Sequence, residues 1–215
     1  MNWEWVTGHL PLIGQLLGEH VFLSVLPVVI GLAVSLPLGI VCSRYPALYG
    51  PVLLLTSVLY AVPSLALFVF LLGVTGLHTT TVVIPLALYT LSVLVRNVVD
   101  GMRSVPDAVR DAAVGMGFGP LRRLVQVELP IAVPLIMAGT RVATVSNISM
   151  VSIGALLGFG GLGQLFTTYG IQLNFFLTAI LTGVVLTVAL AVAADTIIVG
   201  IQRLLTPWAP RGAGR

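Results

Sequence analysis

Long apolar runs separated by short polar connections dominate the chain. A helix that crosses a bilayer needs roughly 20 predominantly apolar residues. Runs of this kind cover residues 21–41, 51–74, 79–95, 131–157 and 175–201. The pattern predicts an all-α, polytopic membrane protein with about five transmembrane helices. The sequence does not decide whether there is a sixth crossing, which would lie either in the amphipathic start of the chain or in the Gly-rich stretch after Leu157.

The same pattern divides the chain into three parts. Residues 1–20 are expected to form an N-terminal segment at the outer membrane interface, and residues 21–203 the transmembrane domain. Residues 204–215 are expected to be a cytoplasmic tail.

Composition supports lipid as the main solvent. The chain has 215 residues, of which 58% are hydrophobic and only 8% charged, and its mean hydropathy is +1.10. Soluble domains carry about 25% charged residues. A soluble fold of this size is therefore excluded. The single cysteine, Cys42, cannot form an intrachain disulfide.

The positive charges predict the orientation of the chain. All ten basic residues are Arg, and half of them lie in the polar segment 96–130: Arg96, Arg103, Arg110, Arg122 and Arg123. Because Arg and Lys accumulate in cytoplasmic loops, we expect this segment on the inside. Arg44, Arg203, Arg211 and Arg215 then fall on the same side, with Glu4, Glu19 and the histidines outside. The N-terminus is predicted outside and the C-terminus in the cytoplasm. Aromatic and basic residues are not interleaved, so a nucleic-acid partner is not expected.

A short helix is predicted within segment 104–130. Ser104 can cap its start, Asp107 follows three residues later, and Pro106 is tolerated in a first turn. Gly117 and the following Gly119-Pro120 should end the helix.

One face of this predicted helix is nearly without side chains. Ala108, Ala112, Gly115 and Met116 recur at helical spacing. Small residues allow a partner to approach closely. An amphipathic piece at 121–127 follows, and Leu129-Pro130 is expected to turn the chain back into the membrane. The alternative is an amphipathic surface loop with chance Ala and Gly.

The spacing within this segment resembles a known motif. It is similar to the "EAA" signature of ABC-importer permeases. The matching pattern is Asp111-Ala112-Ala113, then three residues, Gly117, nine residues, Val127, one residue and Leu129-Pro130. The chain departs from it with Asp for Glu at 111 and Val for Ile at 127. Residues 60–67, 96–97, 138–145 and 155–163 look like permeases of glycine betaine, carnitine and choline importers.

The resemblance implies a type I importer permease with a methionine-permease-like fold in the bacterial plasma membrane. Its implied partners are a cytoplasmic ATPase dimer, a second permease (identical or paralogous) and an extracytoplasmic substrate-binding protein, besides membrane lipid. The implied ATPase-coupling residues are Arg110, Asp111, Ala112, Ala113, Gly115, Gly117, Leu129 and Pro130. ATP and Mg²⁺ belong to the partner, because a chain without Lys cannot form a Walker A loop. No cofactor is expected on this chain, and it is not expected to be an enzyme.

Residues 158–163 (GFGGLG) satisfy the dinucleotide pattern GxGxxG. That pattern requires a preceding strand in a βαβ unit, whereas here it follows a spanning helix and is expected outside. Gly160, Gly161 and Gly163 are interpreted as a flexible turn at an outer gate or at a binding-protein contact; a simple packing turn is the alternative.

Two charges lie inside predicted spans, and such charges usually have partners. At about 1.5 Å per residue, Arg141 lies about 16 Å from Leu129-Pro130 and Asp195 about 12 Å from Arg203. An ion pair between helices is predicted, with a direct part in the transport path as the alternative.

Pro63 beside Ser64 is a candidate for a break that lines a cavity. Tyr60, Tyr89 and Asn147 offer aromatic faces or an amide to a quaternary ammonium group. His9, His20 and His78 lack metal-ligand spacing, so no metal site is expected.

Two alternatives remain for the function. Permeases of methionine or other amino-acid importers share the signature and a similar Gly-Gly-Leu-Gly stretch. A secondary transporter would require inverted repeats and midplane acids, and only Asp195 is present.

Overall fold

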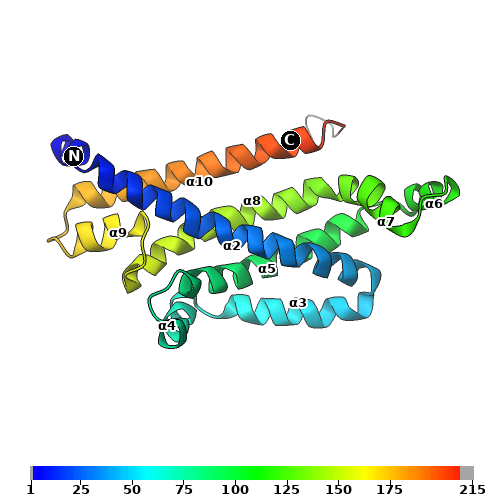
Figure 1. The fold of residues 1–215 in the computed structure, drawn as a ribbon, viewed down its shortest axis with the longest axis horizontal. Coiled ribbons are helices and arrows are strands. Elements are labelled where there is room, and N and C mark those ends of the chain that lie inside the picture. Colours follow the sequence, from blue (N-terminus) through cyan, green and yellow to red (C-terminus); the bar gives the residue numbers. More distant parts are fainter. Residues whose placement is uncertain (1, 209–215) are drawn as a thin grey trace.

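The structure is a computed structural model that describes residues 2–208, and all regular elements in that range are helical (Figure 1). The elements in chain order are α1 (Trp3–Gly8), α2 (Leu10–Arg44), α3 (Pro46–Ala61), α4 (Ser64–Thr75), α5 (Thr80–Arg103), α6 (Asp107–Gly115), α7 (Pro120–Arg123), η1 (Leu124–Glu128), α8 (Leu129–Gly154), η2 (Ala155–Leu157), α9 (Gly163–Phe166), η3 (Thr167–Ile171) and α10 (Leu177–Leu205). The predicted all-α fold class is confirmed.

Four helical stretches of the described chain are long and apolar enough to cross a membrane: Leu10–Arg44, Thr80–Arg103, Pro120–Leu157 and Leu177–Leu205. A fifth crossing results if α3 and α4 together form one span. The helices extend beyond the apolar runs. Helix α2 begins at Leu10 and continues through the predicted boundary at residues 20–21, and α5 continues past residue 95 to Arg103.

The apolar run 51–74 is predicted to form one span, and the structure divides it between two helices. Helices α3 and α4 meet at a bend of 88°. Val62 has extended backbone angles, as is usual for the residue before a proline, and Pro63 follows as the residue that precedes α4. Pro63 has no N–H to donate, so it cannot continue the hydrogen bonding of α3.

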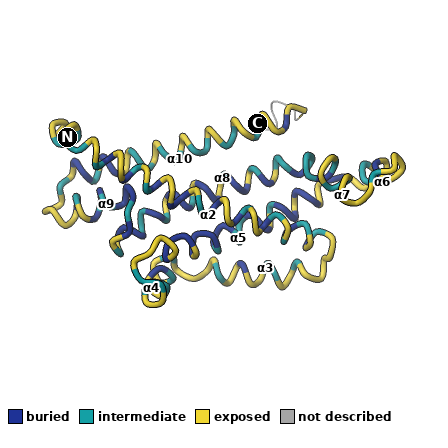
Figure 2. The backbone as a smooth tube through the Cα atoms, viewed as in Figure 1, coloured by how far each residue is buried: buried dark blue, intermediate teal, exposed yellow. Residues whose placement is uncertain are grey.

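Helix α5 lies at the centre of the molecule, in contact with α2, α3 and α8 (Figure 2). Its residues Leu94, Val95, Val98 and Val99 are fully buried. Glycines on the neighbouring helices make the contacts close. A Cβ added at Gly31 would lie 2.7 Å from Cβ of Thr90, and one added at Gly139 would lie 2.5 Å from the side chain of Asn97. Small residues at helix contacts allow this approach in lipid, where packing drives association.

Helix α10 is much less enclosed. It packs on α8, α9 and η3 along one side. Its exposed apolar residues include Val185, Val188, Val192 and Ile197. Exposed apolar side chains on a spanning helix are suited to lipid or to another membrane subunit.

The two ends of the molecule differ in content. Helix α6 projects at one end, and α1 and α9 lie at the other (Figure 1). The C-terminal end of α10 points toward the end that carries α6. Arg44, Arg103 and Arg203 close α2, α5 and α10 at that same end. Arg211 and Arg215 lie outside the described residues.

Candidate functional site

Helix α6 does not begin in the way that the sequence suggested. The predicted cap, Ser104, donates its hydroxyl to the Gly101 carbonyl at 2.7 Å and so completes the end of α5. No side chain caps α6. Pro106 precedes its first residue. Asp107 lies in the first turn, where a negatively charged carboxylate interacts favourably with the helix dipole.

The end of α6 is determined by Gly117. This residue adopts φ +80°, a left-handed conformation that glycine adopts without steric cost. Gly117 N–H donates to the Val114 carbonyl at 2.9 Å and Phe118 N–H donates to the Ala113 carbonyl at 3.0 Å. These two bonds form a Schellman motif, which ends the helix and satisfies its last carbonyls.

The small-residue face of α6 is exposed. Ala108, Ala112 and Gly115 are all open to solvent, and Met116 is 68% exposed. A Cβ added at Gly115 would contact nothing within 4 Å. Ala113 points the other way and is 1% exposed. The helix therefore presents a shallow, accessible surface at the end of the molecule.

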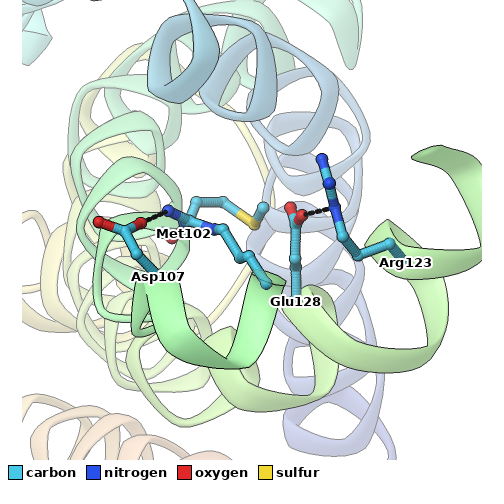
Figure 3. Close-up of polar contacts among 5 residues, drawn as sticks. Met102, Asp107, Arg123 and Glu128 are labelled. Atoms are coloured by element: carbon cyan, nitrogen blue, oxygen red, sulfur yellow. Dashed lines mark hydrogen bonds and ion pairs between the residues drawn. The ribbon is translucent and has the colours of Figure 1, made fainter. Parts of the chain in front are cut away.

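Arg110 fixes α6 to the rest of the chain. Its Nη2 donates to the Met102 carbonyl at the end of α5 at 2.6 Å, and its Nη1 donates to Asp107 Oδ1 at 2.9 Å (Figure 3). Such charge-assisted bonds are stronger than neutral ones. Arg110 thus connects the exposed helix directly to the central transmembrane helix. Asp111, by contrast, is exposed.

The predicted turn at Leu129-Pro130 is wrong. From Pro120 to Gly154 the chain is helical throughout, with the wide-turn segment η1 joining α7 to α8. Leu129 N–H bonds to the Leu124 carbonyl, five residues back. The change of direction lies instead at Gly117–Gly119, between α6 and α7.

An ion pair that the sequence did not indicate spans η1. Arg123 Nε donates to Glu128 Oε1 at 2.7 Å (Figure 3). Glu128 is 3% exposed. A spacing of five residues is not a usual helical pair, and only the wide turn of η1 brings the two side chains together.

Three of the predicted substrate-pathway residues line one hollow between α3, α5 and α8: Tyr60, Tyr89 and Asn147. The two tyrosine rings meet edge to face at 5.7 Å. Tyr89 donates its hydroxyl to the Val62 carbonyl at 2.8 Å, directly at the bend, and Asn147 Nδ2 donates to Thr90 Oγ1 at 3.0 Å. The hollow is too narrow for a water molecule.

The other two predicted pathway residues, Pro63 and Ser64, lie at the bend and not in the lining of this hollow. The Tyr89–Val62 bond connects the bend to the hollow. The sequence indicated each of these residues, but not that the bend and the hollow share a hydrogen bond.

The glycine loop 158–163 is held against α2 and α8. Gly161 N–H donates to Glu19 Oε2 at 3.2 Å, and Leu162 N–H donates to His20 Nδ1 at 3.1 Å. Because Nδ1 accepts, Nε2 carries the proton and donates to the Ile148 carbonyl at 2.9 Å. His20 therefore joins three segments while fully buried.

The three predicted gate glycines are all in close contact. A Cβ added at Gly160 would overlap the Glu19 carboxylate, and one at Gly161 would lie 3.0 Å from His20 Nδ1. One added at Gly163 would lie 2.6 Å from the Ser152 carbonyl. No pattern in the sequence indicated that Glu19 and His20 contact a loop 142 residues away.

The two charges within spans lie opposite each other. Arg141 Nε donates to Asp195 Oδ1 at 2.7 Å and Nη2 donates to Oδ2 at 2.9 Å. This two-pronged geometry joins α8 to α10. Among residues 2–208, no cluster of three potential metal ligands is found.

The chain is thus a bundle of membrane-crossing helices, and at its Arg-rich end it exposes the short helix α6 with a face of small residues. The family described as "Binding-protein-dependent transport system inner membrane component" matches residues 35–209. The chain belongs to this family, as the sequence motif predicted. It is a multi-pass inner-membrane component of a binding-protein-dependent ABC transport system and is not itself catalytic.

Characterised relatives cover most of the chain. It is 37% identical to the glycine betaine/carnitine/choline transport system permease protein OpuCD of Bacillus subtilis over 189 residues, which is 88% of this chain and 82% of OpuCD. It is 34% identical to the choline transport system permease protein OpuBD of the same organism, covering 92% of this chain and 87% of OpuBD. It is also 34% identical to the osmoprotectant import permease protein OsmW of Salmonella typhimurium, covering 88% and 89%.

A solved structure shares the fold. A chain of the methionine ABC transporter MetNI in an inward-facing conformation matches with a TM-score of 0.81 at 22% identity, covering 93% of this chain and 98% of that one. The predicted methionine-permease-like fold is confirmed.

Proposed function

We propose that this chain is the permease subunit of an ABC importer for quaternary-amine osmoprotectants: glycine betaine, carnitine, choline and proline betaine. The observation that carries the proposal is the exposed face of α6, anchored to α5 by Arg110. The named substrates of the relatives support the substrate class.

In this proposal α6 docks into a cleft on a cytoplasmic ATPase. The contact surface consists of Ala112, Gly115 and the exposed Asp111. Ala113 packs α6 against the rest of the chain, and Gly117 ends the helix. The small side chains permit close approach, and Asp111 provides a polar contact at the edge. Leu129 and Pro130 lie at the start of α8 and transmit movement of α6 and α7 into the membrane.

ATP and Mg²⁺ are bound by the partner ATPase dimer, whose closure moves α6. A second permease, identical or paralogous, completes the pathway, and an extracytoplasmic binding protein delivers the substrate. The chain then alternates between inward-open and outward-open states. The inward-facing state of the MetNI structure that shares this fold is compatible with such a cycle.

The N-terminus is proposed outside and the C-terminus in the cytoplasm. The support is the gathering of Arg44, Arg103 and Arg203 at the α6 end, together with the positive-inside rule. Residues 1–20 then lie toward the outer interface and 204–215 in the cytoplasm, with the coupling segment 104–130 on the inside.

The hollow at Tyr60, Tyr89 and Asn147 is proposed as part of the substrate pathway in its closed state. Two aromatic rings suit a quaternary ammonium group, which cation–π contact stabilises. Movement of α4 about Pro63 and Ser64 would break the Tyr89–Val62 hydrogen bond and open the hollow. Gly160, Gly161 and Gly163 are proposed as the outer gate, held shut by Glu19 and His20.

A methionine importer is the second candidate. It rests on the fold shared with MetNI, and the likeness at 22% identity concerns the fold alone.

The test is uptake by the complete assembly in proteoliposomes. With ATP enclosed and the cognate binding protein outside, labelled glycine betaine, choline, carnitine and methionine are compared. We expect accumulation of at least one quaternary amine with ATP and none without it. Accumulation of methionine alone, or uptake that does not need the ATPase, would contradict the proposal.

A further inference from the structure

A second cavity lies near the opposite end of the molecule from α6. It has a volume of about 370 Å³ and is bounded by α2, by residues 77–79 before α5 and by the glycine loop. Its lining includes Glu19, Phe22, Leu23, His78 and Phe159. Ligand sites in proteins have about 300–1,000 Å³, so the cavity has room for a small organic molecule.

Within the described part of the chain, the Glu19 carboxylate has no cationic partner. Its Oε1 accepts from Gln15 Nε2 at 2.9 Å and its Oε2 from Gly161 N–H at 3.2 Å, and both donors are neutral. The three ion pairs within residues 2–208 involve other residues. The chain has no Lys, and no Arg lines the cavity. His78 is the other ionisable side chain of the lining, and its Nδ1 lies 2.6 Å from the Thr75 carbonyl. A cationic ligand in the cavity would balance this half-buried carboxylate.

Beside the polar residues Glu19, His78 and Thr79, the cavity has aromatic and apolar walls. Phe22 lies one turn after Glu19 on the same face of α2 and is 54% exposed. Phe159 of the glycine loop is mostly buried and also belongs to the lining. Aromatic faces attract cations, most strongly when water is excluded. Leu23 and Leu77 add apolar contact.

These features favour a quaternary ammonium group over other cations. Such a group has no N–H to donate, so it needs negative charge, aromatic faces and apolar contact rather than hydrogen-bond acceptors. Both Glu19 oxygens already accept hydrogen bonds from neutral groups of the protein, so the carboxylate attracts a ligand through its negative charge and not as a hydrogen-bond acceptor. A metal ion would need several oxygen or nitrogen ligands, and the described residues contain no such cluster.

We propose that this outer cavity is a binding site for quaternary ammonium cations, in which Glu19 supplies the charge and Phe22 and Phe159 supply the aromatic walls. The inference rests on the proposed function, since it identifies where the carried substrate is first held by the permease. Phe159, Leu23 and Tyr89 belong to one buried cluster. A continuous core thus joins this cavity to the hollow at Tyr60 and Tyr89.

The test measures binding without transport. The permease–ATPase complex in lipid nanodiscs, without binding protein or ATP, is titrated with labelled choline and with tetramethylammonium as competitor. The variants are Glu19→Gln, which retains a hydrogen-bond acceptor, Phe22→Leu, and Phe22→Tyr as a conservative replacement. Glu4→Gln is the matched control, because Glu4 is an exposed acid of α1 at the same end and is not in the cavity lining.

We expect Glu19→Gln to weaken choline binding about tenfold and Phe22→Leu about fivefold, with Phe22→Tyr and Glu4→Gln within about twofold of the original chain. The uncharged isostere 3,3-dimethylbutan-1-ol should bind weakly, and with equal affinity to the original complex and to the Glu19→Gln variant. Equal thermal unfolding midpoints verify folding.

Choline affinity unchanged by Glu19→Gln, or no choline binding by the original complex at millimolar concentration, would overturn the site. Its failure is distinguishable from failure of the proposed function. If the complex transports choline but Glu19→Gln does not weaken choline binding, only the proposed binding site is contradicted. If choline binding depends on Glu19 but no quaternary amine is transported, only the proposed function is contradicted.

Discussion

Arg141 and Asp195 show how a costly pair of residues can be tolerated in lipid. Charged side chains within a span are rare and usually paired, and here each carboxylate oxygen of Asp195 receives one guanidinium N–H. The pair joins α8 to α10, a helix that has few other enclosed contacts. We therefore assign it a role in holding α10 in place.

Removing one partner should destabilise the protein more than removing both. In Arg141→Ala or Asp195→Ala the remaining charge has no partner, whereas the double variant leaves none. We expect a favourable coupling energy of about 0.5–3 kcal/mol between the two sites. Thermal unfolding in detergent measures it, and a double variant no more stable than either single one would contradict the pairing.

At the scale of elements, α6 is a short helix whose position depends on a few contacts. Ala113 is its buried anchor, Gly117 ends it and Arg110 connects it to Met102. A helix of this length is not stable alone. Its orientation relative to α5 should therefore be sensitive to Arg110.

Arg110→Ala should uncouple transport from ATP hydrolysis. Loss of the charged bond to the Met102 carbonyl removes a contact worth about 1.5–3 kcal/mol, and loss of the solvent-exposed pair with Asp107 adds only about 0.2–1 kcal/mol. Helix α6 should therefore remain helical less often and move independently of α5. We expect uptake to fall roughly tenfold while the ATPase still hydrolyses ATP. Arg203→Ala, which removes an exposed Arg at the end of α10, is the control. Equal effects of the two substitutions would argue against a specific role for Arg110.

Sequence alone was sufficient for those elements whose signals are local. Gly117 and its neighbours marked the end of α6, and the small face at Ala108, Ala112 and Gly115 was readable from helical spacing. The start of α2 could not be predicted from the sequence, because Gly14, Gln15 and Gly18 lower the local hydropathy without interrupting the helix. The 88° bend was hidden within one apolar run, since hydropathy carries no direction.

The candidate sites follow the same division. The motif indicated Arg110 as a coupling residue, but not that its partner is the Met102 carbonyl. Glu19 and His20 depend on a contact between segments far apart in the chain, which no spacing rule encodes. The Arg123–Glu128 pair required the wide turn of η1.

At the scale of the whole molecule, the charge distribution predicts how the chain lies in the membrane. Cys42 is fully buried, so a Cys42→Ala background allows single reporters to be placed. Thr168→Cys in η3 and Leu121→Cys in α7 introduce exposed thiols at opposite ends. A membrane-impermeant maleimide should label the first in intact cells, and the second only after the membrane is opened. The reverse pattern would invert the topology.

The central claim is that the exposed face of α6 fits closely against a separate ATPase. Ala112→Asp tests it most directly, because Ala112 is exposed to solvent on the small-residue face of α6. Ala112→Ser keeps the residue small, and Ala47→Asp adds the same charge at an exposed site in α3. ATP-dependent choline uptake by the full complex in proteoliposomes should fall by at least about tenfold for Ala112→Asp and stay near the original rate for the two controls. Undiminished uptake by the Ala112→Asp complex would contradict the account.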